Sequence, residues 1–276
     1  MNDKNRNLVV RVSTAVWALP LVLFLLYKGG YFTAALLGFA AAACTYEYLD
    51  ITLKVRNQAT WFAVAVAAVV PFLPVVRPFE ATALACGLTG VVLLAAWTWH
   101  LLHGPLPEAP VRTAHILMGF VYGTGGLVSL MAIRQLPDGI WWVVATLVVT
   151  WGNDTSAYFA GRLFGKHKLY PEVSPNKTWE GFFGGMAGSI AMLLIQRQFF
   201  FPAMNVGDAL VMGVLGGVLG PAGDLCESML KRAYGVKDSG KIIPGHGGML
   251  DRVDALIFNA PMVLLYVQFA RPAMGH

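Results

Sequence analysis

The chain has 276 residues, of which 57% are hydrophobic and only 13% are charged. Soluble globular domains carry about 25% charged residues, so this composition excludes an ordinary soluble fold and favours an integral membrane protein. The formal net charge of +5 does not indicate a nucleic-acid partner, because most of the chain would lie in lipid. The charge instead fits an anionic membrane surface and anionic substrates.

Nine apolar stretches are long enough to cross a bilayer, for which a helix needs about 20 residues. In chain order they run over 8–27, 31–50, 59–76, 81–102, 113–134, 140–161, 179–200, 207–230 and 252–270. The first lacks a small-residue cleavage site at its end, so we expect a retained span and not a signal peptide. The sequence therefore predicts an all-α, polytopic transmembrane helix bundle of about nine spans.

The distribution of basic residues predicts the orientation of these spans. If the N-terminus is cytoplasmic, 15 of the 20 Lys and Arg residues fall on the inner side and 5 on the outer side. Cytoplasmic segments of membrane proteins carry such an excess of positive charge. We therefore expect a cytoplasmic N-terminus and a C-terminus outside.

Polar residues divide the chain into two regions. Residues 1–138 hold few polar residues within spans, apart from Glu47 and Asp50, and are expected to provide packing, a lipid groove or a dimer interface. Residues 139–276 contain two long inner loops that carry most of the reactive side chains, 162–178 and 231–251. We expect this second region to be catalytic.

Four carboxylates form two pairs beside the last inner loop. Asp224 and Glu227 are spaced i, i+3, as are Asp251 and Asp254, so each pair projects from one face of a helix. Charged residues at membrane depth are costly and usually functional. The two pairs can face each other across a helical hairpin, where Mg²⁺, which takes one or two carboxylates plus phosphate oxygens, would relieve their repulsion.

The same carboxylates could instead form structural ion pairs. Basic residues adjoin both pairs, namely Lys231, Arg232 and Arg252. We expect Asp224 and Asp251 to bind metal, and the other two carboxylates fit either role.

A glycine-rich segment connects the last two predicted spans. It reads Lys237-Asp238-Ser239-Gly240-Lys241-Ile242-Ile243-Pro244-Gly245-His246-Gly247-Gly248. Cations beside glycine-rich backbone, whose N–H groups can face an anion, are typical of phosphate binding, although the spacing is not that of a P-loop. His246 could hydrogen-bond a phosphate, carry a proton, or cap the following helix.

A second polar segment precedes the seventh predicted span and reads Ser174-Pro175-Asn176-Lys177-Thr178-Trp179-Glu180-Gly181. Such residues before a helix N-terminus indicate an anion site, because free amides and the helix dipole favour negative charge. The alternative is an ordinary helix start with Thr178 as N-cap. Within the sixth span, Asp154 could contact substrate or bond to Lys177 or Arg162.

Two glycine series occur in the seventh and eighth predicted spans. Their members are Gly181, Gly184, Gly185 and Gly188, and Gly213, Gly216, Gly217 and Gly220. Small residues at this spacing let helices approach closely in lipid, so we expect close helix packing and not a ligand site.

The segment from Ser228 to Asp254 resembles the signature of the phosphatidate cytidylyltransferases, with no departure over its 27 residues. The segments 153–158 and 174–181 also look like features of that family. The resemblance implies transfer of the cytidylyl group of CTP to phosphatidate, giving CDP-diacylglycerol and pyrophosphate. It also implies Mg²⁺, with K⁺ as a second cation, a homodimer among membrane lipids, and a bacterial inner-membrane location with the active site facing the cytoplasm.

Together with the charge pattern, the resemblance implies roles for individual residues. The catalytic set is Asp224, Asp251, Lys237, His246 and Arg252, of which the two aspartates are the metal ligands. The substrate-binding set is Ser174, Asn176, Lys177, Asp154, Ser228, Lys231, Arg232, Asp238, Lys241, Asp254 and Glu227.

Other functions predict different features. A secondary transporter predicts inverted repeats and midplane broken helices, and neither is evident. A CTP-dependent lipid kinase would release CDP, whereas a cytidylyltransferase for another lipid phosphate would release pyrophosphate. A non-catalytic scaffold would not need the whole polar set.

Overall fold

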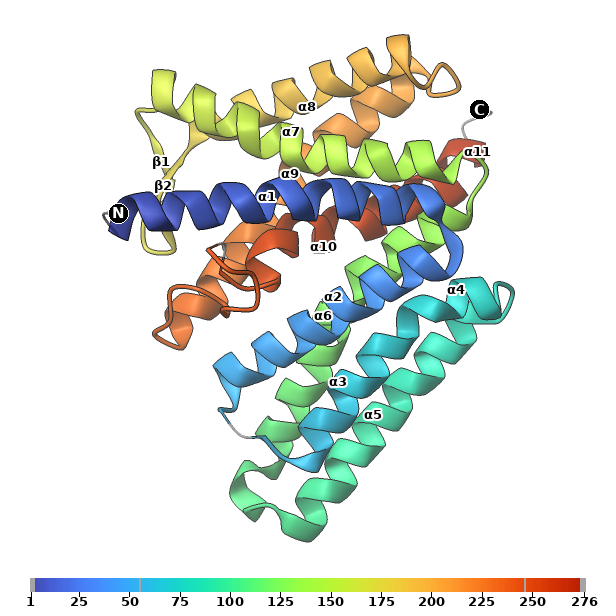
Figure 1. Cartoon of the computed structure of the whole chain (residues 1–276), viewed down its shortest axis with the longest axis vertical. Helices are drawn as coiled ribbons and strands as arrows, with labels where there is room; N and C mark the ends of the chain where they lie inside the picture. The colour runs from blue at the N-terminus through green and yellow to red at the C-terminus, as the bar shows by residue number, and fades with distance from the viewer. Residues whose placement is uncertain (1–2, 55, 246, 274–276) are drawn as a thin grey trace. The chain divides into compact units, whose positions relative to one another are not determined.

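The computed structural model describes residues 3–54, 56–245 and 247–273, with side chains described from residue 13 onward except at 15 and 273. Its main elements are helical (Figure 1). The helices are α1 (Asp3–Lys28), α2 (Gly30–Thr52), α3 (Gln58–Val69), α4 (Leu73–Val76), α5 (Ala81–His103), α6 (Ala109–Gln135), α7 (Gly139–Phe164), α8 (Trp179–Phe199), α9 (Val206–Ala233), α10 (Leu250–Leu265) and α11 (Arg271–Ala273). Short 3-10 helices cover Val70–Phe72 and Leu106–Glu108, and a π-helical turn covers Tyr266–Ala270.

The predicted polytopic helical bundle is confirmed in its coarse form. Six helical segments in the described residues are long and apolar enough to cross a membrane, namely Gly30–Thr52, Gln58–Val76, Ala81–His103, Leu106–Gln135, Val206–Ala233 and Leu250–Ala270. The other three predicted stretches are also helical, in α1, α7 and α8. The number of spans and the orientation of the termini stay predictions.

The fold is not entirely helical. A two-stranded antiparallel hairpin, β1 (Lys168–Tyr170) and β2 (Ser174–Thr178), lies within the segment that the sequence indicated only as a loop. Thr178 ends β2 and begins α8, since its side-chain oxygen accepts a hydrogen bond from the backbone N–H of Gly181 at 3.1 Å. The N-cap that was considered as the alternative reading is therefore present, and it joins the hairpin directly to a helix.

Glu180 fixes the start of β1 at this same open end of the hairpin, where Lys168 pairs with Thr178. Its carboxylate accepts hydrogen bonds from the backbone N–H of Lys166 at 3.1 Å and of His167 at 3.2 Å, and lies 2.6 Å from His167 Nδ1. The N–H of Trp179 also donates to the carbonyl of His167 at 2.9 Å. The end of β2 and the start of β1 are thus both held at the first turn of α8.

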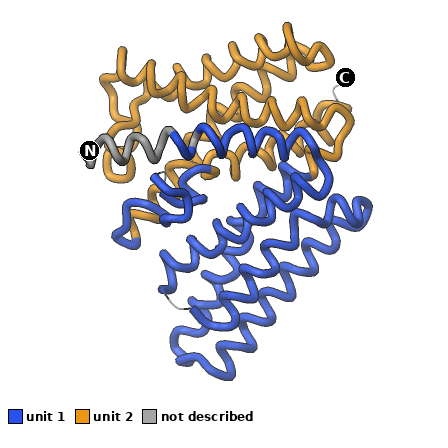
Figure 2. The backbone as a smooth tube through the Cα atoms, in the orientation of Figure 1, with its two compact units in different colours: residues 1–131, 234–252 blue, residues 132–233, 253–276 orange. Residues whose placement is uncertain are grey.

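The chain divides into two compact units (Figure 2). Unit 1 comprises residues 1–131 and 234–252, and unit 2 comprises 132–233 and 253–276. The predicted boundary at 138 and the roles of the two predicted regions stay predictions. The segment 234–252, expected to group with the C-terminal region, instead groups with the N-terminal helices.

In unit 1, α2 packs against α3 and α6 through small residues. A Cβ at Gly123 of α6 would lie 2.8 Å from the backbone nitrogen of Thr45, and one at Gly119 would lie 2.6 Å from the ring of Tyr48. Backbone approach of this kind needs glycine, because any side chain would overlap the facing helix. Helix α2 has an almost continuous series of buried residues from Thr33 to Ile51, and this series includes Glu47.

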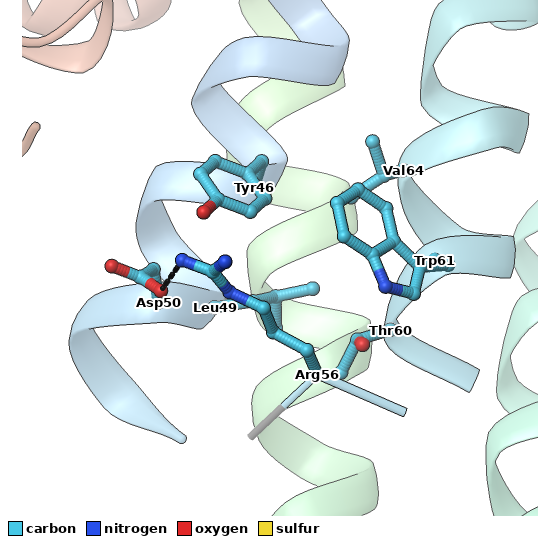
Figure 3. A pocket seen from close by; sticks show the side chains of 7 residues that line it. All are labelled: Tyr46, Leu49, Asp50, Arg56, Thr60, Trp61 and Val64. Atoms are coloured by element: carbon cyan, nitrogen blue, oxygen red, sulfur yellow. Dashed lines mark hydrogen bonds and ion pairs between the residues drawn. The ribbon is translucent and has the colours of Figure 1, made fainter. Parts of the chain in front are cut away.

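The connection from α2 to α3 is closed by polar and aromatic contacts (Figure 3). Arg56 donates to Asp50 at 3.2 Å and lies over the ring of Tyr46, which stacks on Trp61 at a centroid distance of 5.7 Å. The hydrogen bond to Asp50 raises the pKa of the Arg56 guanidinium. The enclosed space is only about 10 Å³, so this is a structural contact and not a ligand site.

In unit 2, both glycine series pack helices together as predicted. Cβ atoms at Gly184 and Gly188 would overlap Ala160 and Ser156 of α7. In the second series, a Cβ at Gly217 of α9 would lie 2.9 Å from the backbone of Met186 of α8. Helices α7, α8 and α9 therefore form a closely packed support for the polar residues at their ends.

Asp208 anchors the far end of unit 2. Its side chain is fully buried and accepts hydrogen bonds from the hydroxyl of Tyr266 at 2.8 Å and from Nε of Arg271 at 3.2 Å. The Arg271 guanidinium also lies over the ring of Trp142, 5.2 Å from its centroid. The ion pair joins the start of α9 to α11 and is compensated by hydrogen bonds, as a buried charge requires.

Candidate functional site

A lysine–aspartate pair lies at the centre of the polar region of unit 2. Nζ of Lys177, from strand β2, lies 2.7 Å from Oδ2 of Asp224, from α9. The hydroxyl of Ser228, one turn further along α9, donates to Oδ1 of the same aspartate at 3.2 Å. Both charged side chains are partly exposed, at 24% and 35%, so they are ordered by the protein while still open to a ligand.

Two further carboxylates surround this pair. Asp154, from α7, and Asp254, from α10, interact electrostatically with Asp224 and with Lys177. We call these four residues the lysine–carboxylate cluster. Three carboxylates face one ammonium group, and such an excess of negative charge favours a bound cation.

A cavity of about 500 Å³ opens beside the cluster within unit 2. Its polar lining comes from α7, the hairpin and α9, and includes Asp154, Arg162, Ser174, Asn176, Lys177 and Asp224. Aromatic and small residues line the remainder, among them Tyr158 and Phe182. Residues of the predicted segments 153–158 and 174–181, together with Asp224, are thus brought to one cavity of a size suited to a small-molecule ligand.

The donor set of the cluster fits Mg²⁺ chemically. Mg²⁺ binds through one or two carboxylates and completes its shell with water and phosphate oxygens. Among the described residues, no three His, Cys, Asp or Glu side chains converge as a ready-made metal site. Asp224, with its neighbouring carboxylates, therefore suits an ion that is held jointly with a phosphate-bearing substrate.

The glycine-rich loop, residues 234–245 and 247–249 between α9 and α10, forms a second polar region in unit 1. It borders a cleft of about 610 Å³ lined by Asp238, Lys241, Gly247 and Arg252, among others. Lys237, Lys241 and Arg252 are exposed. The loop folds back on itself where the N–H of Ile243 donates to the carbonyl of Gly247 at 3.0 Å. Gly247 has a φ of 84°, which favours glycine.

Asp251 organises this loop. Its Oδ2 accepts hydrogen bonds from the backbone N–H of Ser239 at 3.0 Å, from the hydroxyl of Ser239 at 2.9 Å, and from the N–H of Gly248 at 2.9 Å. The glycine-rich backbone thus presents these two N–H groups to an anion, but the anion is not a phosphate. They bind a carboxylate of the protein itself.

Sequence reasoning assigned no role in the site to Glu47. This residue of α2 is 1% exposed, and its carboxylate accepts hydrogen bonds from the N–H groups of Met249 at 2.9 Å and Leu250 at 2.8 Å. It also accepts from the hydroxyl of Ser239 at 3.2 Å. The only sequence signal was a carboxylate inside an otherwise apolar span, which is costly unless it is satisfied or functional.

Comparison with known proteins identifies the family. Residues 9–270 match the cytidylyltransferase family. The chain belongs to this family. A phosphatidate cytidylyltransferase of Staphylococcus aureus is 32% identical over 268 residues, which cover 94% of this chain and 99% of the relative. Phosphatidate cytidylyltransferases of Staphylococcus epidermidis and Staphylococcus haemolyticus are 43% and 42% identical over 156 residues, which cover 56% of this chain and 59% of each relative.

The remaining predicted site residues of this family member lie in different settings. Glu227 and Lys231 form an ion pair one turn apart on α9 and are almost completely buried, which is the structural alternative considered for them. Arg232 is exposed at the end of α9. His246 lies outside the described residues.

The two predicted metal ligands belong to different units. Asp224 is in unit 2 and Asp251 is in unit 1. Their facing each other across a hairpin stays a prediction.

Proposed function

We propose that this chain transfers the cytidylyl group of CTP to phosphatidate, giving CDP-diacylglycerol and pyrophosphate. The observation that carries the proposal is the match to the Staphylococcus aureus phosphatidate cytidylyltransferase over 99% of that relative's length. The polar residues of the chain suit such a reaction, since exposed cations and clustered carboxylates are the groups that phosphate chemistry with a divalent cation uses.

The reaction needs no activated side-chain nucleophile. Phosphatidate carries its own nucleophile, a phosphate oxygen, which attacks the α-phosphorus of CTP. A new P–O bond forms there, the bond from the α-phosphorus to the bridging oxygen breaks, and pyrophosphate leaves. The protein then contributes positioning and charge neutralisation. In this proposal Lys177 neutralises a phosphate in the unit 2 cavity, and Ser174 and Asn176 on the same strand orient it.

Within the same proposal, Asp224 and Asp251 hold Mg²⁺, and K⁺ is a second cation. A divalent ion bound with phosphate oxygens would supply neutralisation of the charge that develops on the leaving group. Lys177 already contacts one oxygen of Asp224, so it holds that carboxylate in place and provides a second positive charge beside the substrate.

The proposal also includes the cellular setting. The chain would cross the bacterial inner membrane nine times, with a cytoplasmic N-terminus and active site, and would act as a homodimer. The charge asymmetry of the sequence, with 15 of 20 basic residues on one side, supports this orientation.

A pyrophosphate-release assay on the detergent-purified protein tests the activity. CTP, phosphatidate and Mg²⁺ are supplied together and then omitted one at a time, and the lipid product is identified by mass spectrometry. We expect release only when all three are present, with a cytidine-bearing lipid as product. Release of CDP in place of pyrophosphate, or no turnover by folded protein in lipid, would overturn the proposal.

A further inference from the structure

The glycine-rich loop is held by a carboxylate that comes from the N-terminal part of the chain. Both oxygens of Glu47 receive hydrogen bonds from the loop and its junction with α10: Oε1 from the N–H of Met249, and Oε2 from the N–H of Leu250 and the hydroxyl of Ser239. The side chain is 1% exposed. A buried carboxylate is tolerated only when such donors satisfy it, so the contact is a specific fit.

The glycines of the loop are shaped around this carboxylate. A Cβ at Gly240 would overlap the carboxylate of Glu47, with its Cδ at 2.8 Å. A Cβ at Gly248 would lie 2.6 Å from Oε2 of Glu47 and would overlap the hydroxyl of Ser239. Neither glycine has a positive φ, so backbone conformation does not explain them. They leave room for Glu47, which the loop encloses from two sides.

Ser239 links Glu47 to the second carboxylate of the loop. Its hydroxyl lies 3.2 Å from Oε2 of Glu47 and 2.9 Å from Oδ2 of Asp251. Two backbone N–H groups donate to Asp251, those of Ser239 and Gly248. Two more donate to Glu47, those of Met249 and Leu250. This arrangement fixes both ends of the segment that presents Lys241 to the cleft.

We propose that Glu47 is a positioning residue of the enzyme. Its carboxylate holds the glycine-rich loop in the conformation that places Lys241 and Arg252 at the cleft, where they bind a phosphate of the substrate. The second half of this statement rests on the proposed function, whereas the first half is a property of the fold alone. Helix α2 therefore contributes to the site without contacting the substrate.

The negative charge of Glu47 is essential to this role. The N–H groups of Met249 and Leu250 point at different oxygens of the carboxylate, and only a group that accepts at both positions satisfies them together. The amide of a glutamine has one oxygen and one NH₂ group. Glu47→Gln would therefore place that NH₂ group against the backbone N–H of either Met249 or Leu250, where no hydrogen bond can form. Glu47→Asp keeps the charge but shortens the reach by one methylene, and it should restore part of the effect.

Limited proteolysis tests the structural half of the proposal without any substrate. Trypsin cleaves after Lys241 once the loop is released, and the site is identified by mass spectrometry. We expect Glu47→Gln to speed cleavage there by about tenfold or more, since hydrogen bonds to a charged group are among the strongest. Asp50→Asn is the matched control, because Asp50 lies one turn further along α2 and forms only an exposed ion pair. Equal cleavage rates in Glu47→Gln and wild type would overturn the proposal.

Steady-state kinetics test the catalytic half. For Glu47→Gln we expect kcat to fall and the KM for CTP to rise by about tenfold, because misplaced cations weaken phosphate binding. A smaller fraction of folded protein would lower the apparent kcat and leave KM unchanged. That result would contradict a positioning role for Glu47. If Glu47→Gln does not fold, Ser239→Ala removes one donor and should show a smaller change of the same kind. An inactive wild type would disprove the proposed function and leave the proteolysis result standing.

Discussion

Lys177 on strand β2 and Asp224 on α9 are in direct contact, with 2.7 Å between Nζ and Oδ2. The lysine reaches this position because its strand runs without a linker into α8, which packs on α9 through glycines. A charge pair of this kind at the mouth of a cavity suits the binding of a metal and a phosphate together. Its parts can be tested separately.

Lys177→Met should lower the rate of pyrophosphate release by about 10²- to 10³-fold, the usual effect of removing a group that stabilises developing charge. Methionine lacks the ammonium group but keeps most of the length of the side chain, so the fold should persist. Lys28→Met is the matched control, because Lys28 is exposed at the end of α1. Initial rates at saturating CTP make the comparison, and equal rates in the two variants would contradict a role for Lys177.

Asp224→Asn should raise the Mg²⁺ concentration needed for half-maximal rate by at least about tenfold. Mutating a residue that only orients a metal ligand already lowers metal affinity by about 10- to 100-fold, and a ligand should matter at least as much. The substitution removes the charge and keeps the shape. A Mg²⁺ titration of the initial rate, after treatment with a chelator, gives the value. An unchanged Mg²⁺ requirement with a lower maximal rate would show that Asp224 acts on Lys177 and not on the metal.

Gly184→Ala should destabilise the protein by about 1–3 kcal/mol, the typical cost of an extra carbon in a packed interface. The new Cβ would overlap Ala160 on the facing helix. Gly87→Ala on α5 is the control, because no atom lies within 4 Å of its added Cβ. Thermal unfolding in detergent compares the two, and equal midpoints would mean that α7 and α8 can separate without cost.

Arg271→Ala should destabilise unit 2 by about 3–5 kcal/mol, because it leaves the buried charge of Asp208 without its cation. Arg77→Ala removes a pair in which both side chains are at least 60% exposed and should cost about 1 kcal/mol or less. Differential scanning fluorimetry of both variants measures the difference. Similar shifts for the two would indicate that Asp208 becomes solvated when Arg271 is lost.

The features that sequence predicted well are those set by local pattern. Apolar length located the helices, and glycine spacing predicted that α8 and α9 are closely packed, because small residues at three- and four-residue spacing let helices approach each other. Thr178 was considered as an N-cap from its own residue type and position. Each of these inferences needs only neighbours within one or two turns.

The features that were missed depend on contacts between distant residues. The hairpin is short and mostly exposed, so no alternation of apolar residues marks it. Glu47 lies more than 190 positions before the residues it binds, and one sequence holds no signal of that pairing. For the lysine–carboxylate cluster, the sequence analysis considered a bond between Asp154 and Lys177 but did not predict the ion pair of Lys177 with Asp224. Their meeting in one cavity follows from how α7, β2 and α9 pack.

The hydrogen bonds between Glu47 and the glycine-rich loop also have a consequence for truncated forms of this chain. A fragment beginning at residue 139 would retain every residue of the signature segment, from Ser228 to Asp254. It would nevertheless lack the acceptor for the N–H groups of Met249 and Leu250. The C-terminal half therefore depends on the N-terminal half for the conformation of its glycine-rich loop. A chimera that takes its first half from a relative would need a carboxylate at the position of Glu47 in α2.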